Sequence, residues 1–304
     1  MAIKTALLKS MVVLPLCLGL MSTVSAAPLA PGSDARDRLE TRVNQFHLLD
    51  DQALLTLESG FATLLRAQSE QELADARKSL KQVGFEWQML DEDLVMLADT
   101  QGVGLGHYVF RINTLSDLML QAPHQFFDRF TGQLSIDLFA RSNARVLALN
   151  SAHRRLDIRD RSGNADIAHL ERTALSALTR AFGLAKPTGV VVQLHGFAEG
   201  KRRSEAGRTA DIIISSGQRW LQPVADRMAT CLTNIGLGQV RRYPLDVGEL
   251  GGTTNTQGAA LRRLGNNRFV HLELSRALRE RLLASDTDLN ALGNCLPESN
   301  GDPS

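Results

Sequence analysis

The sequence is poor in cysteine, carries almost no net charge and, after its first residues, contains no long apolar run. Three of its 304 residues are cysteine, and the formal net charge is +1 at pH 7. A balanced charge gives no electrostatic footprint for nucleic acid, so we expect no nucleic-acid partner. The composition, 43% hydrophobic and 22% charged, is typical of a globular protein with one large domain or a domain with an appendage.

Two motifs of common enzyme classes are also missing. No Gly-x-Ser-x-Gly nucleophile elbow occurs in the sequence, which disfavours a serine hydrolase. The glycine-rich run 102–106 is not followed by the Lys-Ser/Thr pair of a phosphate-binding loop. We therefore interpret this run as a turn.

The first 26 residues have the pattern of a secretory signal peptide. Lys4 and Lys9 precede an apolar run at 11–21, and Val24–Ser25–Ala26 supplies small residues for cleavage. The apolar run is too short to span a membrane. We therefore expect a periplasmic or secreted protein with no stable membrane span.

Removal of that segment takes Cys17 away and leaves two cysteines. Cys231 and Cys295 could then form one disulfide in an oxidising compartment, which would pin the C-terminal tail to a helix. Two buried free thiols are the alternative interpretation.

The remaining chain divides by its hydrophobic pattern. Residues 27–84 form a helical N-terminal segment, in which Ser69 and Glu72 make a capping box. Residues 85–296 alternate between strand and helix patterns, which indicates a layered α/β domain. Residues 297–304 are expected to be a flexible tail.

The individual elements follow from periodicity and from turn residues. A helical pattern continues through Leu39, Val43 and Phe46, and another helix is expected over 167–182, closed by Gly183. The glycine-rich stretch from 246 to 267 reads as a long loop. Strands are expected at 94–97, 107–112, 118–122, 145–150, 189–195, 211–214, 239–245 and 269–274.

Functional side chains are expected where strands end. The apolar run 190–194 ends in His195, and ligands of open α/β sheets bind at such ends. Glu273 is a carboxylate within an otherwise apolar strand, and its burial requires a cation, a metal or a proton. Glu273 is therefore the strongest catalytic candidate, whereas a core histidine bonded to a carbonyl is the alternative for His195.

His124, Asp128 and His195 form a candidate zinc site. Catalytic zinc takes three protein ligands of this type and keeps one position open for water. Zinc lowers the pKa of this water, and a nearby carboxylate such as Glu273 can take its proton. The alternative is that Asp128 caps a helix beginning near Phe130 and that His124 bonds a backbone group.

The order of the motifs carries a family resemblance. The motifs are Pro123–His124 with Asp128, Asn150 with His153–Arg154, Ala168–His169, Leu194–Gly196, Ala210–Ile214 and Val270–Arg276. Over roughly residues 107–285, this order resembles the N-formylglutamate amidohydrolase and zinc-carboxypeptidase-like superfamily, of which polyglutamate hydrolases are a similar branch. The resemblance implies a three-layer α/β/α fold with a mixed sheet, of the zinc carboxypeptidase type.

The resemblance also implies roles for single residues. One zinc ion would be held by His124, Asp128 and His195, and Glu273 would be the general base. Asn150 and Arg154 match positions that hold a substrate carboxylate in this superfamily.

Arginine is plentiful beside these motifs, and guanidinium groups bind carboxylates in a bidentate fork. The residues concerned are Arg154, Arg155, Arg202, Arg203, Arg208, Arg263 and Arg268. Unless these are solvated surface arginines, the substrate is a small acidic acyl-amino acid or peptide. The sequence thus predicts an exported zinc-dependent amidohydrolase, and the alternative is a non-catalytic exported binding or assembly protein that retains the fold.

Overall fold

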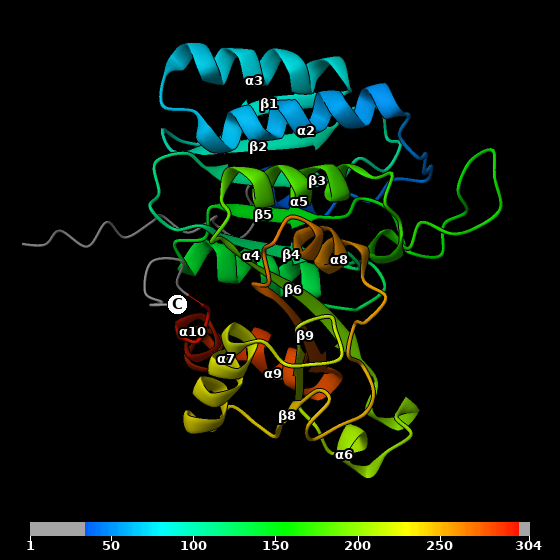
Figure 1. Cartoon of the computed structure of the whole chain (residues 1–304), viewed down its shortest axis with the longest axis vertical. Helices are drawn as coiled ribbons and strands as arrows, with labels where there is room; N and C mark the ends of the chain where they lie inside the picture. Colours follow the sequence, from blue (N-terminus) through cyan, green and yellow to red (C-terminus); the bar gives the residue numbers. More distant parts are fainter. Residues whose placement is uncertain (1–33, 298–304) are drawn as a thin grey trace, which may run out of the picture.

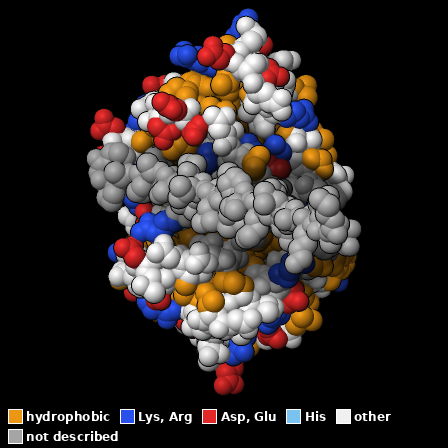
Figure 2. Space-filling model, turned by 90° about the vertical axis from the view of Figure 1, so that its left-hand side faces the viewer, with side chains coloured by type: hydrophobic (Ala, Val, Ile, Leu, Met, Phe, Trp, Pro, Cys, Tyr) orange, Lys and Arg blue, Asp and Glu red, His pale blue; other side chains and the backbone are white. Residues whose placement is uncertain are grey.

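A computed structural model describes residues 34–297 of the chain. The predicted signal peptide and nearly all of the expected C-terminal tail therefore lie outside the described residues. Among the helices within 34–297, none combines the length and the hydropathy needed to cross a membrane. On the face shown in Figure 2, basic and acidic side chains of the described residues are interspersed.

Within the described residues, one mixed sheet runs through the molecule, with β1 near the top of Figure 1 and β8 near the bottom. Its strand order is β1-β2-β3-β5-β4-β6-β9-β7-β8. The strands are β1 (Phe85–Met89), β2 (Leu94–Asp99), β3 (His107–Arg111), β4 (Leu118–Ala122), β5 (Val146–Leu149), β6 (Val190–Phe197), β7 (Ile212–Ser215), β8 (Val240–Arg242) and β9 (Phe269–Ser275). The central strands β5, β4, β6 and β9 are parallel to one another. On the two sides of this group, β3 pairs antiparallel with β5 and β7 pairs antiparallel with β9.

Helices cover both faces of this sheet. They are α1 (Asp34–Leu39), α2 (Asp51–Arg66), α3 (Glu70–Gln82), α4 (Thr131–Arg141), α5 (Ala174–Ala185), α6 (Glu205–Arg208), α7 (Pro223–Asn234), α8 (Thr256–Arg263), α9 (Arg276–Ala284) and α10 (Asp286–Asn294). Val192 and Leu272 face a core formed with α4, α7, α9 and α10. On the opposite face of the same two strands, Val191 and Phe269 face a second core formed with α2, α3, α5 and α8. The predicted three-layer α/β/α arrangement with a mixed sheet is confirmed.

The N-terminal helices belong to the second core. Helix α2 packs along α5, where Arg180 Nε lies 2.7 Å from Glu58 Oε2. The ring of Phe61 meets those of Phe85 and Tyr108 with centroid separations of 6.0 and 5.6 Å. Aromatic contacts of this kind make the helical segment one layer of the fold.

Residues 40–50 are not helical, so the expectation that a helix continues beyond Leu39 is wrong. The backbone N–H of Val43 instead donates to Ser151 O at 2.9 Å, and Val43 forms a bridge with Ala152. The apolar residues of this segment have helical spacing, but their backbone groups bond a distant loop. Tertiary contacts therefore override the local pattern.

The stretch 246–267 is not entirely a loop, because it contains α8. Asn255 precedes this helix and its side chain accepts from Gly258 N at 2.9 Å, as an N-cap does. Strand β1 is a further element that the sequence pattern did not indicate.

Helix α5 also differs from expectation at both ends. It begins at Ala174 and not at 167, because Ile167–His169 form a separate 3-10 turn. Gly183 lies inside the helix and does not close it. A Cβ at Gly183 would lie 3.0 Å from Leu264 Cδ1, so glycine allows α5 to pack closely against the end of α8.

Cys231 and Cys295 form a disulfide, with a Cα–Cα separation of 5.7 Å. Cys231 lies in α7 and Cys295 directly follows α10. The bridge therefore ties the C-terminal end of the described chain to a helix of the first core.

Candidate metal centre

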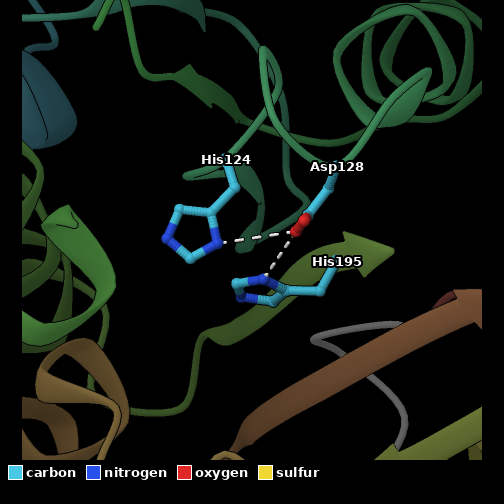
Figure 3. A group of neighbouring side chains, drawn as sticks. All are labelled: His124, Asp128 and His195. Atoms are coloured by element: carbon cyan, nitrogen blue, oxygen red, sulfur yellow. Dashed lines mark hydrogen bonds and ion pairs between the residues drawn. The ribbon is translucent and has the colours of Figure 1, made fainter. Parts of the chain in front are cut away.

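Two predicted ligands come from the loop between β4 and α4, and the third comes from the end of β6. The backbone N–H of Asp128 donates to His124 O at 2.8 Å, and this single turn brings both side chains to one side of the loop. In Figure 3 the Asp128 carboxylate faces the rings of His124 and His195, with a dashed line to each. Asp128 Oδ2 lies 3.5 Å from His124 Nδ1 and 3.2 Å from His195 Nδ1. All three side chains are buried.

The other ring nitrogen of each histidine has a fixed partner. His124 Nε2 lies 2.7 Å from Asp166 Oδ1, and His195 Nε2 lies 2.8 Å from Gln193 Oε1. A carboxylate or an amide oxygen can only accept, so each Nε2 carries the hydrogen and donates it. This assigns the Nδ1 lone pairs of both imidazoles to the space around Asp128.

Arg154 supports the same tautomer of His124. Its Nη1 lies 3.3 Å from His124 Nδ1, and a guanidinium can only donate. Arg154 also pairs with Asp166, and its guanidinium lies 5.1 Å from the ring centroid of Phe127. The structure thus places the predicted substrate residue Arg154 directly beside the candidate metal ligands.

The spacing of the three donors fits a zinc ion. Ligand atoms at about 2.0–2.2 Å from a tetrahedral zinc are roughly 3.4 Å apart, and the two distances to Asp128 are 3.2 and 3.5 Å. Burial raises the pKa of Asp128, but the hydrogen bonds and positive charge that His124 and His195 supply when they are protonated outweigh burial and hold this pKa well below the usual range. An ionised carboxylate and two imidazole nitrogens are ordinary zinc ligands.

The two structural alternatives for these residues do not occur. Helix α4 begins at Thr131, whose N–H and hydroxyl both donate to the backbone carbonyl of Asp128 and not to its carboxylate. The ring of His124 contacts side chains of Asp128, Asp166 and Arg154. Side-chain chemistry, and not helix capping, therefore accounts for the position of the Asp128 carboxylate.

Glu273 lies on the neighbouring strand at the same level. The β6–β9 register pairs His195 with Glu273 and Gln193 with His271. Burial and, to a lesser extent, the charge of Asp128 raise the pKa of Glu273 to about 8. Its Oε2 atom is buried and has no hydrogen-bond partner among the described residues. Glu273 is therefore a carboxyl group that can hold a proton near neutral pH.

The side chain of Asn150, predicted to bind a substrate carboxylate, bonds backbone groups. Its amide donates to Pro123 O at 3.0 Å and to Ala152 O at 2.8 Å, and its oxygen accepts from Ala152 N at 3.0 Å. Both N–H groups are thus used by backbone carbonyls, one of which belongs to the residue before His124. This geometry gives Asn150 the role of an anchor for the loop and lends no support to contact with substrate.

Several residues of the site were not indicated by the sequence analysis. Gln193 Oε1 accepts from Asn255 Nδ2 at 2.6 Å, and Gln193 Nε2 donates to Gln121 Oε1 at 2.8 Å. Two glutamines within otherwise apolar strands were a signal for this buried network. Asp166 gave no such signal, because it lies in an irregular segment far along the chain from His124.

Arg279 supports the end of β6 from α9. Its guanidinium donates to Ser275 O, Phe197 O and Arg129 O. A Cβ at Gly196 would lie 2.4 Å from this guanidinium. Glycine after His195 is therefore required for the arginine to join three segments around the site.

Comparisons with known proteins give distant structural matches. No family model matches the chain, and no curated protein matches it. Among solved structures, it is similar to an N-formylglutamate amidohydrolase from Ralstonia eutropha JMP134, with 14% identity over 62% of this chain and 93% of the other and a TM-score of 0.39. A bacteriophage poly-gamma-glutamate hydrolase is 11% identical over 72% and 91% of the two chains, with a TM-score of 0.39.

A third match is an aspartoacylase family protein from Mesorhizobium loti, 10% identical over 72% of each chain with a TM-score of 0.41. At these TM-scores, the roles of individual residues rest on the contacts within this chain.

Proposed function

We propose that this protein is an exported zinc-dependent hydrolase that cleaves an amide bond in an acidic acyl-amino acid or peptide. The observation that carries the proposal is the convergence of two Nδ1 lone pairs on the buried carboxylate of Asp128. An adjacent strand places the buried carboxyl of Glu273 beside them. Metal ligands and an acid–base group within one buried cluster are the parts that metal-assisted hydrolysis requires.

His124 and His195 would hold the zinc ion through Nδ1, and Asp128 would hold it through its carboxylate. When bound, zinc supplies a water molecule of lowered pKa and a positive charge that polarises the substrate carbonyl. Asp166 and Gln193 fix the orientation of the two imidazoles by accepting their Nε2 hydrogens.

Glu273 would move the proton. It accepts a proton from the attacking water as the oxygen bonds to the carbonyl carbon. It then donates this proton to the amine nitrogen as the carbon–nitrogen bond breaks, so that a carboxylic acid and an amine are formed. A pKa of about 8 in the metal-free protein shows how strongly burial favours the protonated form. Nearby positive charge would lower this pKa toward the value that a general base needs.

Arg154 would hold an acidic substrate at the mouth of the site. Its side chain is partly exposed, and it lies between His124 and the ring of Phe127. Arg155 lies over the same ring at 4.8 Å from the centroid. One guanidinium beside His124 and a second one over the neighbouring ring of Phe127 favour a substrate that carries a carboxylate near the scissile amide.

The proposal is tested by metal-dependent hydrolysis. The purified chain from residue 27 onward is screened against N-acylated aspartate and glutamate and against glutamyl peptides, before and after chelation. We expect activity that chelation abolishes and zinc restores, and Glu273→Gln lowers kcat by about 10²- to 10⁴-fold. Full activity in Glu273→Gln, or activity that chelation leaves unchanged, would contradict the proposed mechanism.

A further inference from the structure

A second set of candidate metal ligands lies on the other side of His195. Single ligand atoms of His195, His271 and Glu273 all lie within 4.8 Å of one another, and the three side chains are buried. Two histidines and a glutamate are a donor set found in catalytic zinc sites. His195 belongs to β6, and His271 and Glu273 belong to the adjacent strand β9.

His271 and Glu273 both have buried polar atoms without partners. Nδ1 of His271 and Oε2 of Glu273 make no hydrogen bond among the described residues. The nearest approach of the two side chains, Nε2 to Oε1, is 3.9 Å, which is too long for a hydrogen bond. Buried polar atoms are normally paired, and a cation held by the two side chains would give the Glu273 carboxylate a partner.

The fold fixes His271 in this position. Strand β9 pairs His271 with Gln193 of β6 on one side and with Ser215 of β7 on the other. A Cβ at Gly252 would lie 2.7 Å from His271 Cδ2, so the backbone of the 246–255 loop lies against the imidazole. The rings of His271 and His195 have centroids 4.6 Å apart. His271 is thus held beside His195, although it is not one of the three predicted zinc ligands.

His195 can serve only one cation at a time. Its Nε2 hydrogen is taken by Gln193, so a single nitrogen is left for a metal. We propose that the site offers two alternative positions for one cation, which share His195. The first position adds His124 and Asp128, and the second adds His271 and Glu273.

The two positions differ in consequence. In the second position Glu273 is a metal ligand, so it is no longer available as the general base, and the loaded protein is inactive. The donors of the first position already have the spacing of zinc ligands, at 3.2 and 3.5 Å, whereas His271 Nε2 and Glu273 Oε1 are 3.9 Å apart, which favours the first position. This inference rests on the metal site of the proposed function but not on the reaction.

Metal binding by ligand variants tests the two positions. Metal-free protein is titrated with Zn²⁺ by calorimetry and with Co²⁺ by its visible absorption spectrum, for wild type, His124→Ala, His271→Ala and the double variant. Circular dichroism verifies folding, and Asp128→Asn replaces His124→Ala if the latter does not fold.

We expect wild type and His271→Ala to bind one ion each with similar affinity. His124→Ala should still bind one ion, at least about 10-fold more weakly and with a changed Co²⁺ spectrum, and the double variant should bind none. Loss of all binding in folded His124→Ala, or equal binding by the single and double variants, would overturn the second position while leaving the proposed function intact. No binding by wild type would overturn both.

Discussion

The two faces of strands β6 and β9 carry opposite chemistry. On one face Val192, Leu194, Leu272 and Leu274 are buried in an apolar core beneath α4, α7, α9 and α10. On the other face the intervening residues are Gln193, His195, His271 and Glu273, which are also buried. Successive side chains of a strand point to opposite faces of the sheet. Adjacent residues of β6 and β9 therefore belong in turn to the apolar core and to the candidate metal site.

The difference lies in how each face is satisfied. The apolar face is closed by packing and by the Cys231–Cys295 disulfide. The polar face is held by hydrogen bonds to side chains such as Gln121 and Asn255, and atoms of His271 and Glu273 still have no partner among the described residues. The comparison teaches that a buried surface can be fully enclosed and yet retain groups that require a ligand.

The largest expected effect separates Glu273 from its neighbour Leu272. Glu273→Gln should lower kcat by about 10²- to 10⁴-fold, because the proton acceptor is lost. Leu272→Ala should cost about 2–5 kcal/mol of unfolding free energy by leaving a cavity. Steady-state kinetics and urea unfolding of both variants measure this contrast. Similar kinetic losses in the two variants, per folded molecule, would remove the distinction between the faces.

The second effect is a pH dependence of stability in the metal-free protein. The pKa of Glu273 is about 8 in the folded state against an ordinary 4.5, so between these values the folded state holds a proton that the unfolded state releases. Stability from this group is therefore full below pH 4.5 and is lost as pH rises toward 8.

Glu273→Gln removes this dependence. At pH 8 the metal-free variant should be more stable than wild type by up to roughly 4–5 kcal/mol, and the gap should close near pH 4.5. Urea unfolding in the presence of chelator at both pH values measures the difference. Parallel stability curves for the two proteins would contradict a raised pKa for Glu273.

The third effect concerns the apolar face alone. Replacing Cys231 and Cys295 with alanine should lower the unfolding free energy by about 4 kcal/mol in the chain-entropy model, because the bridge closes a loop over a sequence separation of 64. Zinc affinity should not change, since neither cysteine contacts the polar face. A loss of zinc binding at temperatures where the variant is folded would show that the two faces are coupled.

The smallest effect concerns the groups that orient the metal ligands. Asp166→Ala and Gln193→Ala should each weaken zinc binding by about 10- to 100-fold, because the imidazoles lose the acceptors that fix their tautomer. Asp160→Asn, a change at an exposed carboxylate, serves as the control. Competition with a chromophoric chelator measures the affinities, and equal values for all four proteins would contradict the assigned tautomers.

Sequence periodicity predicted the residues that lie at strand ends. Alternation along β9 isolated Glu273, and the end of β6 isolated His195, because both signals are local. Asp166 could not be found this way, since its contact with His124 is created by an irregular loop. Helix α8 was missed within a glycine-rich stretch, although its Gln257 donates to Ile167 O inside the buried network. The place of Asp166 and the formation of α8 depend on tertiary contacts and not on local propensity.

The most direct test of the account is the metal content of the purified chain from residue 27 onward, measured by elemental analysis. We predict about one zinc per chain in wild type and in His47→Ala, a change at a partly exposed histidine distant in sequence from the site. His195→Ala should contain none, because His195 supplies a nitrogen to either cation position. Zinc-free wild type after zinc supplementation, or unchanged zinc in His195→Ala, would contradict the metal centre.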